Sequence, residues 1–390
     1  MSLSGATPSR AHAPLVAARG AWAAVCLSFS LLQIAGCSAP AATSIGGAET
    51  ASPPAAAATA AEAYPLPMPE PDPEHAARET SGPAGLVVYS GRTESLVGPL
   101  IEAFEATSGL QVDVRYGDTG ELAVTLLEEG DRSPADVFFA QEPGGLGEVA
   151  AMLAPLPADV LGAVEPQYRA ADGSWVGISG RARVVVFNTD KLMAEDLPAD
   201  IRAFIGPEWK GRVGWAPANA SFQSMVTAMR RTWGEDETRR WVEGMVANGA
   251  VAFPKNGPIV QAVADGEIDV GFVNHYYLYG FLAEEGEAFK ARNAVLREGG
   301  PASILLVAGA AILKTAAHPE AAERFVRFLQ GTEAQHFFAE RTWEYPLSAG
   351  VQPDAQLPAL ADLKLTTLDL GALDDIAGSV AMLRDAGALP

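Results

Sequence analysis

Two adjacent tyrosines, Tyr276 and Tyr277, follow an apolar run at 268–273 that is typical of a buried strand. Paired phenols at the end of a strand are poor core residues, because each hydroxyl needs a hydrogen-bond partner. They are good ligands for a hard trivalent cation such as ferric iron, since a nearby cation favours the phenolate over a phenol whose ordinary pKa is about 10. The pair equally fits the start of an ordinary helix, so both interpretations stay open at this point.

The elements that must position these phenols alternate between strand and helix. Strand patterns occur at 86–89, 111–116 and 135–140, and helix patterns at 94–107 and 121–129. This order implies an α/β fold, in which a parallel sheet carries helices on its faces and ligands sit beyond the carboxyl ends of the strands. The polar residues at those ends are Arg92, Thr93, Gln141, Glu142, Asn256 and Asn274.

Two long strand patterns, at 182–188 and 303–313, lie in the middle and late parts of the chain. Helix patterns at 235–248 and 319–330 accompany them. Two such strands are what a chain needs to cross between two lobes and return. This arrangement predicts a hinged cleft.

The N-terminus predicts export and lipidation. Arg10 and Arg19 precede an apolar stretch, 20–35, that is too short for a comfortable membrane span, and two small residues then precede Cys37. We interpret 1–36 as a lipoprotein signal peptide cleaved before Cys37, although a plain secretory signal with a stray cysteine is the alternative. Residues 37–84 are rich in Ala and Pro and predict a disordered tether. A mature chain whose one cysteine is Cys37 has no disulfide and no thiolate metal site.

Composition and motifs exclude several classes of protein. The formal net charge of -21 argues against nucleic-acid binding. The chain has no Gly-x-Ser-x-Gly elbow, no Walker loop and no dinucleotide glycine fingerprint. We therefore expect that the protein is not an enzyme.

Six segments, in order, carry a resemblance to a known family. They are VYSGR (88–92), EGDRSPADVFF (129–139), SGRARVVV (179–186), WKGRVG (209–214), NHYYLY (274–279) and EYPL (344–347). In these segments the chain resembles the periplasmic ferric-iron-binding proteins, the solute receptors of iron ABC transporters. The resemblance covers roughly 85–351.

The resemblance implies a two-lobed periplasmic-binding-protein fold of type II, with mixed, mostly parallel sheets and two crossing hinge strands. Lobe 1 would comprise 85–183 and 306–350, and lobe 2 would comprise 184–305 and 351–390. It also implies that Tyr276 and Tyr277 are the metal ligands. The family's histidine, carboxylate and third-tyrosine positions fall at Thr93, Gln141 and the loop 217–221, none of which keeps the family's ligand. Glu142 lies beside Gln141 and could serve only after a local shift.

Candidate anion-binding residues are available near these positions. The resemblance assigns this role to Asn219, Ala220, Ser221, Asn256 and Asn274. Arg181 and Arg183 could add charge-assisted contacts, although salt bridges elsewhere would explain both arginines as well. Asn256, beside a Gly-Pro pair, also fits a turn residue.

The sequence as a whole predicts a monomeric, lipid-anchored substrate-binding protein of an ABC importer. It would capture ferric iron with carbonate, phosphate or an organic-acid anion and deliver it to a permease and its ATPase. It would reside in the cell envelope, in the periplasm of a two-membrane host or on the outer face of the plasma membrane of a one-membrane host. The alternatives are a receptor for an oxyanion or small organic acid, and a ligand sensor that docks onto a membrane signalling protein.

Overall fold

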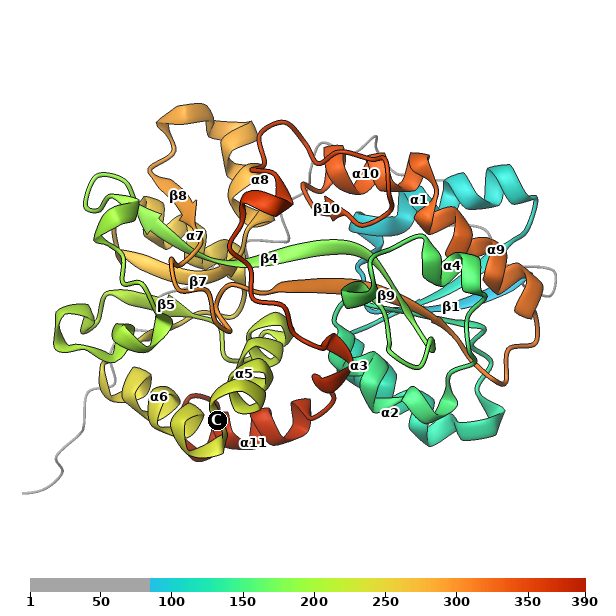
Figure 1. Ribbon diagram of the computed structural model, residues 1–390, viewed down its shortest axis with the longest axis horizontal. Helices are drawn as coiled ribbons and strands as arrows, with labels where there is room; N and C mark the ends of the chain where they lie inside the picture. The colour runs from blue at the N-terminus through green and yellow to red at the C-terminus, as the bar shows by residue number, and fades with distance from the viewer. Residues whose placement is uncertain (1–84) are drawn as a thin grey trace, which may run out of the picture. The chain divides into compact units, whose positions relative to one another are not determined.

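The computed structural model describes residues 85–390. The predicted signal peptide, the tether and the lipidation site Cys37 lie outside the described residues. Strands and helices alternate along the described chain, which confirms the predicted α/β class. Figure 1 shows the helices packed on both faces of a long sheet.

The strands are β1 (Leu86–Ser90), β2 (Val112–Tyr116), β3 (Val137–Ala140), β4 (Val176–Asn188), β5 (Val213–Trp215), β6 (Val251–Ala252), β7 (Val270–Asn274), β8 (Ala291–Ala294), β9 (Leu305–Ile312) and β10 (Tyr345–Pro346). The helices are α1 (Glu94–Ser108), α2 (Thr119–Glu129), α3 (Pro143–Glu148), α4 (Ala158–Gly162), α5 (Ala220–Trp233), α6 (Glu235–Ala247), α7 (Asn256–Ala264), α8 (Tyr276–Glu285), α9 (Pro319–Gln330), α10 (Thr332–Arg341) and α11 (Ile376–Asp385).

Two elements show where the sequence pattern was clear and where it was not. Helix α9 has the predicted bounds, because Pro319 at its start and Gly331 after its end mark both limits. The strand predicted at 182–188 begins earlier, at Val176, and is buried along its whole length. Its first part contains Gly177, Ser179 and Gly180, which interrupt the hydrophobic pattern and hid the strand.

The sheet is mixed, as predicted, but it is not mostly parallel, because the two long central strands run antiparallel to all of their neighbours. Its strand order is β2-β1-β3-β9-β4-β7-β5-β6, with β8 and β10 paired to β4 beside this path. The pairs are parallel within β2-β1-β3 at one end and within β6-β5-β7 at the other. Every pair that involves β4 or β9 is antiparallel, so the parallel character is confined to the two ends.

Strand β4 joins the two ends of the sheet. Residues 176–182 pair with β9 and, at Ser179 and Gly180, with β10, whereas residues 183–188 pair with β7 and β8. Strand β9 pairs with β4 from Leu305 onward. The residue before it, Ile304, accepts the Arg183 N–H with its carbonyl at 2.9 Å. We call β1, β2, β3, β9 and β10 with their helices the first half, and β5, β6, β7 and β8 with theirs the second half.

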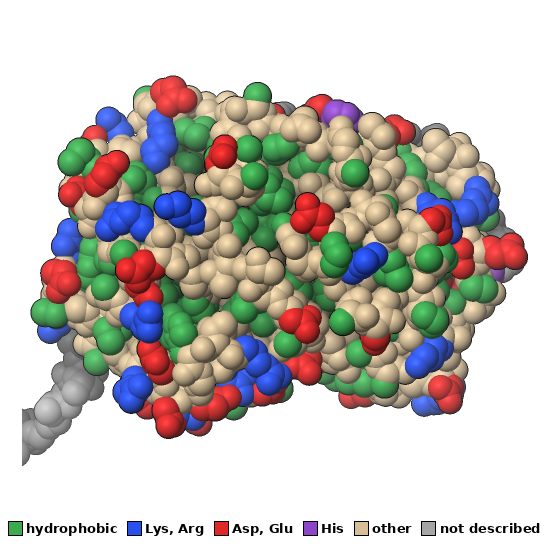
Figure 2. Space-filling model, viewed as in Figure 1, with side chains coloured by type: hydrophobic (Ala, Val, Ile, Leu, Met, Phe, Trp, Pro, Cys, Tyr) green, Lys and Arg blue, Asp and Glu red, His purple; other side chains and the backbone are tan. Residues whose placement is uncertain are grey.

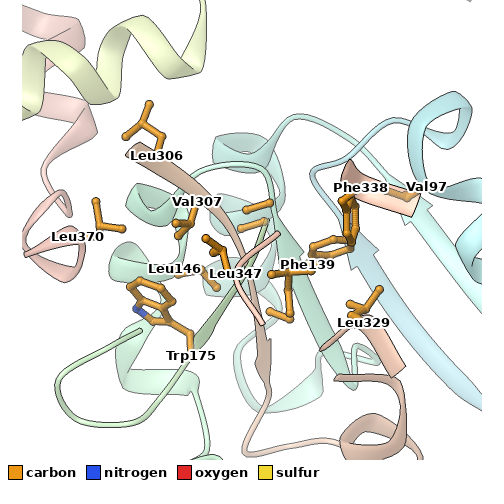
Figure 3. Close-up of a cluster of buried hydrophobic side chains, with 14 of the residues drawn as sticks. Val97, Phe139, Leu146, Trp175, Leu306, Val307, Leu329, Phe338, Leu347 and Leu370 are labelled. Carbon is orange, nitrogen blue, oxygen red and sulfur yellow. The ribbon is translucent and has the colours of Figure 1, made fainter. Parts of the chain in front are cut away.

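Each half has a dense apolar core. In the first half, Trp175, Leu146 and Val307 belong to one apolar cluster, part of which Figure 3 shows. In the second half, the rings of Trp241 and Phe272 lie 5.9 Å apart and belong to a separate cluster. The first cluster also includes second-half residues such as Ile259 and Phe281, so the apolar core continues from one half into the other.

The C-terminal segment contacts both halves. Leu370–Ala372 packs against α3, where a Cβ added to Gly144 would lie 2.6 Å from the Ile376 side chain. Helix α11 then docks on α5, where the hydroxyls of Thr227 and Ser379 lie 2.7 Å apart. The chain therefore crosses from α3 to α5 a further time after β4 and β9.

The surface is charged but not segregated by sign. Acidic and basic side chains are interspersed on the face shown in Figure 2, although the net charge of the chain is -21. Of the helices described in 85–390, none combines the length and the apolar character that crossing a bilayer requires.

Candidate functional site

The ends of three first-half elements are held together near the sequence-predicted site. The Thr119 hydroxyl, at the start of α2, accepts the Gln141 N–H at 3.0 Å. A Cβ at Gly91 would collide with the Thr119 side chain and lie 3.0 Å from the Gln141 nitrogen, so only glycine fits there. The loop after β1 and the loop after β3 are thereby fixed against α2. Thr93 is exposed at the start of α1, and Gln141 is half-buried.

The tyrosine doublet opens α8. Strand β7 ends at Asn274, and Tyr276 is the first residue of the helix. The two phenol rings stack with their centroids 4.3 Å apart, and both side chains are half-buried. Burial raises the pKa of Tyr276 well above its ordinary value, and Tyr277 raises it further. Without a cation Tyr276 is therefore neutral, and a cation would have to displace its proton in order to bind.

Arg183 lies beside the doublet as a buried cation without an acidic partner. Its Nη1 donates to the side-chain oxygens of Asn274 at 3.0 Å, Ser221 at 3.3 Å and Asn256 at 3.4 Å. Its Nε and Nη2 have no hydrogen-bond partner, and no carboxylate within 85–390 reaches ion-pair distance. Burial lowers the pKa of Arg183 to about 10, against the opposing influence of Glu142 and the two tyrosines.

The polar residues around Arg183 mark the starts of helices. Asn219 is the N-cap of α5, Ala220 is its first residue, and Asn256 is the first residue of α7. The Asn219 side-chain oxygen accepts from Ser221 at 2.5 Å and from the Asn256 amide at 3.1 Å. Helix N-termini carry partial positive charge and bind anions. Because these helix N-termini surround a positive guanidinium, like charges destabilise the empty site. A bound anion would remove this destabilisation.

Arg181 and Glu142 form a buried ion pair. The Arg181 Nη1 lies 3.0 Å from Glu142 Oε1, and its Nη2 donates to the Gln141 carbonyl. Glu142 Oε2 has no partner. Arg181 and Arg183 lie two residues apart on β4 and so project to the same side of the strand. Arg181 is compensated within the protein, whereas Arg183 is not.

Arg92, predicted to line the cleft, is already paired within the protein. Its guanidinium is buried and forms a bidentate ion pair with Glu344, at 2.5 and 3.1 Å. Ser179 donates to the same carboxylate. Arg92 is therefore a structural residue, because its charge is already neutralised by a buried partner.

The structure brings together most of the sequence-predicted residues. Arg183 gathers Ser221, Asn256 and Asn274, with Asn219 one hydrogen bond away. His275, directly before the doublet, is unavailable to a ligand, because both of its ring nitrogens are hydrogen-bonded to backbone groups. Its contacts, and the role of Glu344, were not predicted.

No cluster of three or more His, Cys, Asp or Glu residues suited to a metal occurs in residues 85–390. A metal at this site would therefore depend on the phenolic oxygens of Tyr276 and Tyr277 and on donors that it brings with it. This set is made of hard oxygen donors, which suit a hard cation.

Known proteins share this architecture. Residues 86–344 match the family described as bacterial extracellular solute-binding protein. The chain is 32% identical to the Fe(3+)-binding periplasmic protein of Serratia marcescens over 319 residues, which cover 80% of this chain and 93% of that protein. Among solved structures, iron-bound HitA from Pseudomonas aeruginosa aligns with a TM-score of 0.73 at 33% identity, over 77% of this chain and 99% of that one.

A Trichodesmium protein, IdiA (FutA), in complex with iron and citrate, aligns with a TM-score of 0.68 at 26% identity, over 77% of this chain and 99% of that one. These likenesses confirm the two-lobed type II periplasmic-binding-protein fold. The family consists of extracytoplasmic transport receptors, which confirms that the protein is not an enzyme. The chain belongs to the bacterial extracellular solute-binding proteins and, among them, to the periplasmic ferric-iron-binding proteins.

Proposed function

We propose that this protein captures ferric iron together with an anion, as the substrate-binding component of an ABC iron importer. The observation that carries the proposal is the buried, uncompensated guanidinium of Arg183 beside the phenols of Tyr276 and Tyr277. The phenols offer two anionic donors to a metal, and Arg183 offers an anion the N–H groups of two unpartnered nitrogens, Nε and Nη2. The names of the iron-binding relatives support the same cargo.

A charge count explains why the anion should be required. Ferric iron and Arg183 together bring four positive charges, and the two phenolates supply two negative ones. Arg181 and Glu142 neutralise each other. A dianion, such as carbonate, hydrogen phosphate or a dicarboxylate, would restore neutrality in a buried site, where an unpaired charge is costly. Thr93, Gln141 and Ser221 add no negative charge.

The proposed capture requires the two halves to act as lobes. We assign 85–183 and 306–350 to lobe 1 and 184–305 and 351–390 to lobe 2, with residues 370–373 packed against α3 of lobe 1. The halves share β4, so bending at this strand would close them over the ligand. The anion-binding Asn219, Ala220, Ser221, Asn256 and Asn274 all belong to lobe 2.

The test is the colour of the protein with and without an anion. Purified, metal-free protein receives ferric iron from a weak chelator in a buffer that contains carbonate, citrate, phosphate or none of these. We expect a visible phenolate-to-iron absorption band with at least one anion, and a much weaker band in the anion-free buffer. Proton release and a smaller radius of gyration should accompany the band. A colourless protein under every condition would refute iron capture.

Arg183 also supports a second candidate function. The site could receive an organic acid or oxyanion without iron, with the phenols acting as hydrogen-bond donors. Calorimetric titration with citrate or phosphate in the absence of iron separates the two functions, because a receptor for the anion alone binds it just as tightly without metal.

We further propose that the protein is a monomer anchored in the cell envelope by a lipid on Cys37, with 37–84 as the tether and a membrane permease with its ATPase as partners. Changing Cys37→Ser should abolish incorporation of a labelled fatty acid and release the protein into the soluble fraction. Labelling that survives the substitution would mean that Cys37 is not the acceptor.

A further inference from the structure

His275, which directly precedes the doublet, is held on every side. Its Nδ1 accepts the Ala182 N–H at 3.1 Å, and its Nε2–H donates to the Trp343 carbonyl at 2.7 Å. Its own N–H donates to the Ala182 carbonyl at 2.9 Å, and its carbonyl accepts the Asn293 amide at 2.8 Å. Its ring stacks on Tyr345 with centroids 4.9 Å apart. The imidazole therefore has one tautomer and one orientation.

The partners of His275 come from both halves of the protein. Asn293 lies on β8 of the second half, and Ala182 lies where β4 changes its pairing. Trp343 follows the end of α10, and Tyr345 lies on β10, both in the first half. A buried histidine needs two hydrogen bonds, which residues of a single half could supply. The contacts of His275 instead come from both halves.

The turn that meets His275 is strained and anchored. Trp343 has φ 50, and it is the one non-glycine residue of the described chain with a positive φ. Such a conformation is unfavourable for a residue with a side chain and persists only where the surroundings fix it. Here Glu344 is bound to Arg92 and Ser179, and Tyr345 pairs with Gly180 of β4. These contacts direct the Trp343 carbonyl toward the imidazole.

The same imidazole also contacts the doublet. Its ring lies edge-on to Tyr276 with centroids 6.0 Å apart, and Tyr276 in turn stacks on Tyr277. A displacement of His275 would therefore change the direction in which both phenols point.

We propose that His275 is a positioning residue, which holds Tyr276 and Tyr277 in metal-ligating orientation only while the first-half turn at 343–345 is docked against it. The geometry of the phenols thereby depends on the arrangement of the two halves. This inference rests on the proposed capture of iron, because it concerns how the iron ligands are oriented.

Two isosteric substitutions separate the two ring contacts. Gln places an amide donor near the position of Nε2 and can keep the bond to Trp343, whereas Asn places an acceptor near Nδ1 and keeps only the bond to Ala182. Each variant is loaded with ferric iron and carbonate. The measurements are the wavelength of the phenolate-to-iron band and the rate of iron release to a strong chelator.

We expect His275→Gln to release iron within about threefold of the parent rate and to keep its band. We expect His275→Asn to shift the band and release iron about 10–100-fold faster, the range for the loss of a residue that orients a metal ligand. A purely structural histidine would lower the melting temperature without moving the band. If the two variants behave alike, the contact with Trp343 does not position the doublet.

Two further variants complete the test. His336→Asn, on the exposed side of α10, is the matched control and should change neither reading. If His275→Asn does not fold, Asn293→Ala removes the amide that holds the His275 carbonyl and should shift the band in the same direction; an unchanged band overturns the inference. A parent protein without any band refutes iron capture and this inference with it, whereas a coloured parent with an unaltered His275→Asn variant overturns the inference alone.

Discussion

Replacing Tyr276 or Tyr277 with phenylalanine is expected to remove the visible iron band and to weaken ferric iron binding by more than about 100-fold. The loss should exceed the effect, about 10–100-fold, of removing a residue that only supports a ligand, because a ligand itself is removed. Each substitution deletes one anionic donor and keeps the stacked ring, whose centroid lies 4.3 Å from its neighbour. The apo protein should be as stable as the parent, because burial already keeps Tyr276 protonated. Iron titration followed by absorbance measures both effects.

Tyr279→Phe is the matched control for these variants. Tyr279 lies on the same helix, is half-buried and contacts His275 edge-on at 6.3 Å, but it does not belong to the doublet. It should bind iron as the parent does. If the Tyr276→Phe and Tyr277→Phe variants also bind iron as the parent does, the doublet is an ordinary helix start, and the anion-receptor function remains.

Arg183→Met is expected to stabilise the apo protein while it removes the function. Burial lowers the pKa of Arg183 to about 10, so at any pH below about 10 the charged guanidinium destabilises the folded state by about 3 kcal/mol. The penalty is present in full at neutral pH and is lost as the pH rises from about 10 toward the ordinary pKa of arginine. The lost hydrogen bonds offset part of this gain. The free energy of unfolding should rise by about 1–2 kcal/mol in urea titration.

Arg181→Met should have the opposite effect on stability. Arg181 is paired with Glu142, so its removal leaves a buried carboxylate uncompensated and is expected to destabilise the protein by about 3–5 kcal/mol.

Iron binding by the Arg183→Met variant should weaken at least about tenfold and no longer respond to carbonate, because the anion has lost its cation. If Arg183→Met keeps the carbonate response, the anion binds elsewhere.

The doublet and the strand ends were predictable because their signals are local. The run 268–273 and the pair Tyr276–Tyr277 occupy consecutive positions, and the helix and strand periods around them are clear. The start of β4 was not predictable, since Gly177 and Gly180 carry no side chain to reveal a strand period.

The distinction between Arg181 and Arg183 was not predictable either. Both are arginines on the same side of one strand, and the sequence cannot tell which of them finds a carboxylate. The deciding partner, Glu142, lies 39 residues from Arg181, and the partner of Arg92, Glu344, lies 252 residues away. The tie between His275 and Trp343 spans 68 residues and ends on a backbone carbonyl, which no side-chain pattern reveals.

The continuity of β4 means that the two lobes are not separable folding domains. This strand has neighbours on both edges in each half, β9 and β10 in one and β7 and β8 in the other. If the chain were cut between 183 and 184, each fragment would keep only part of this central strand. The backbone N–H and C=O groups of the neighbouring strands would then be unpaired and could pair with other chains. The protein can thus bend as two bodies but has to fold as one, and selection on either lobe acts on the stability of both.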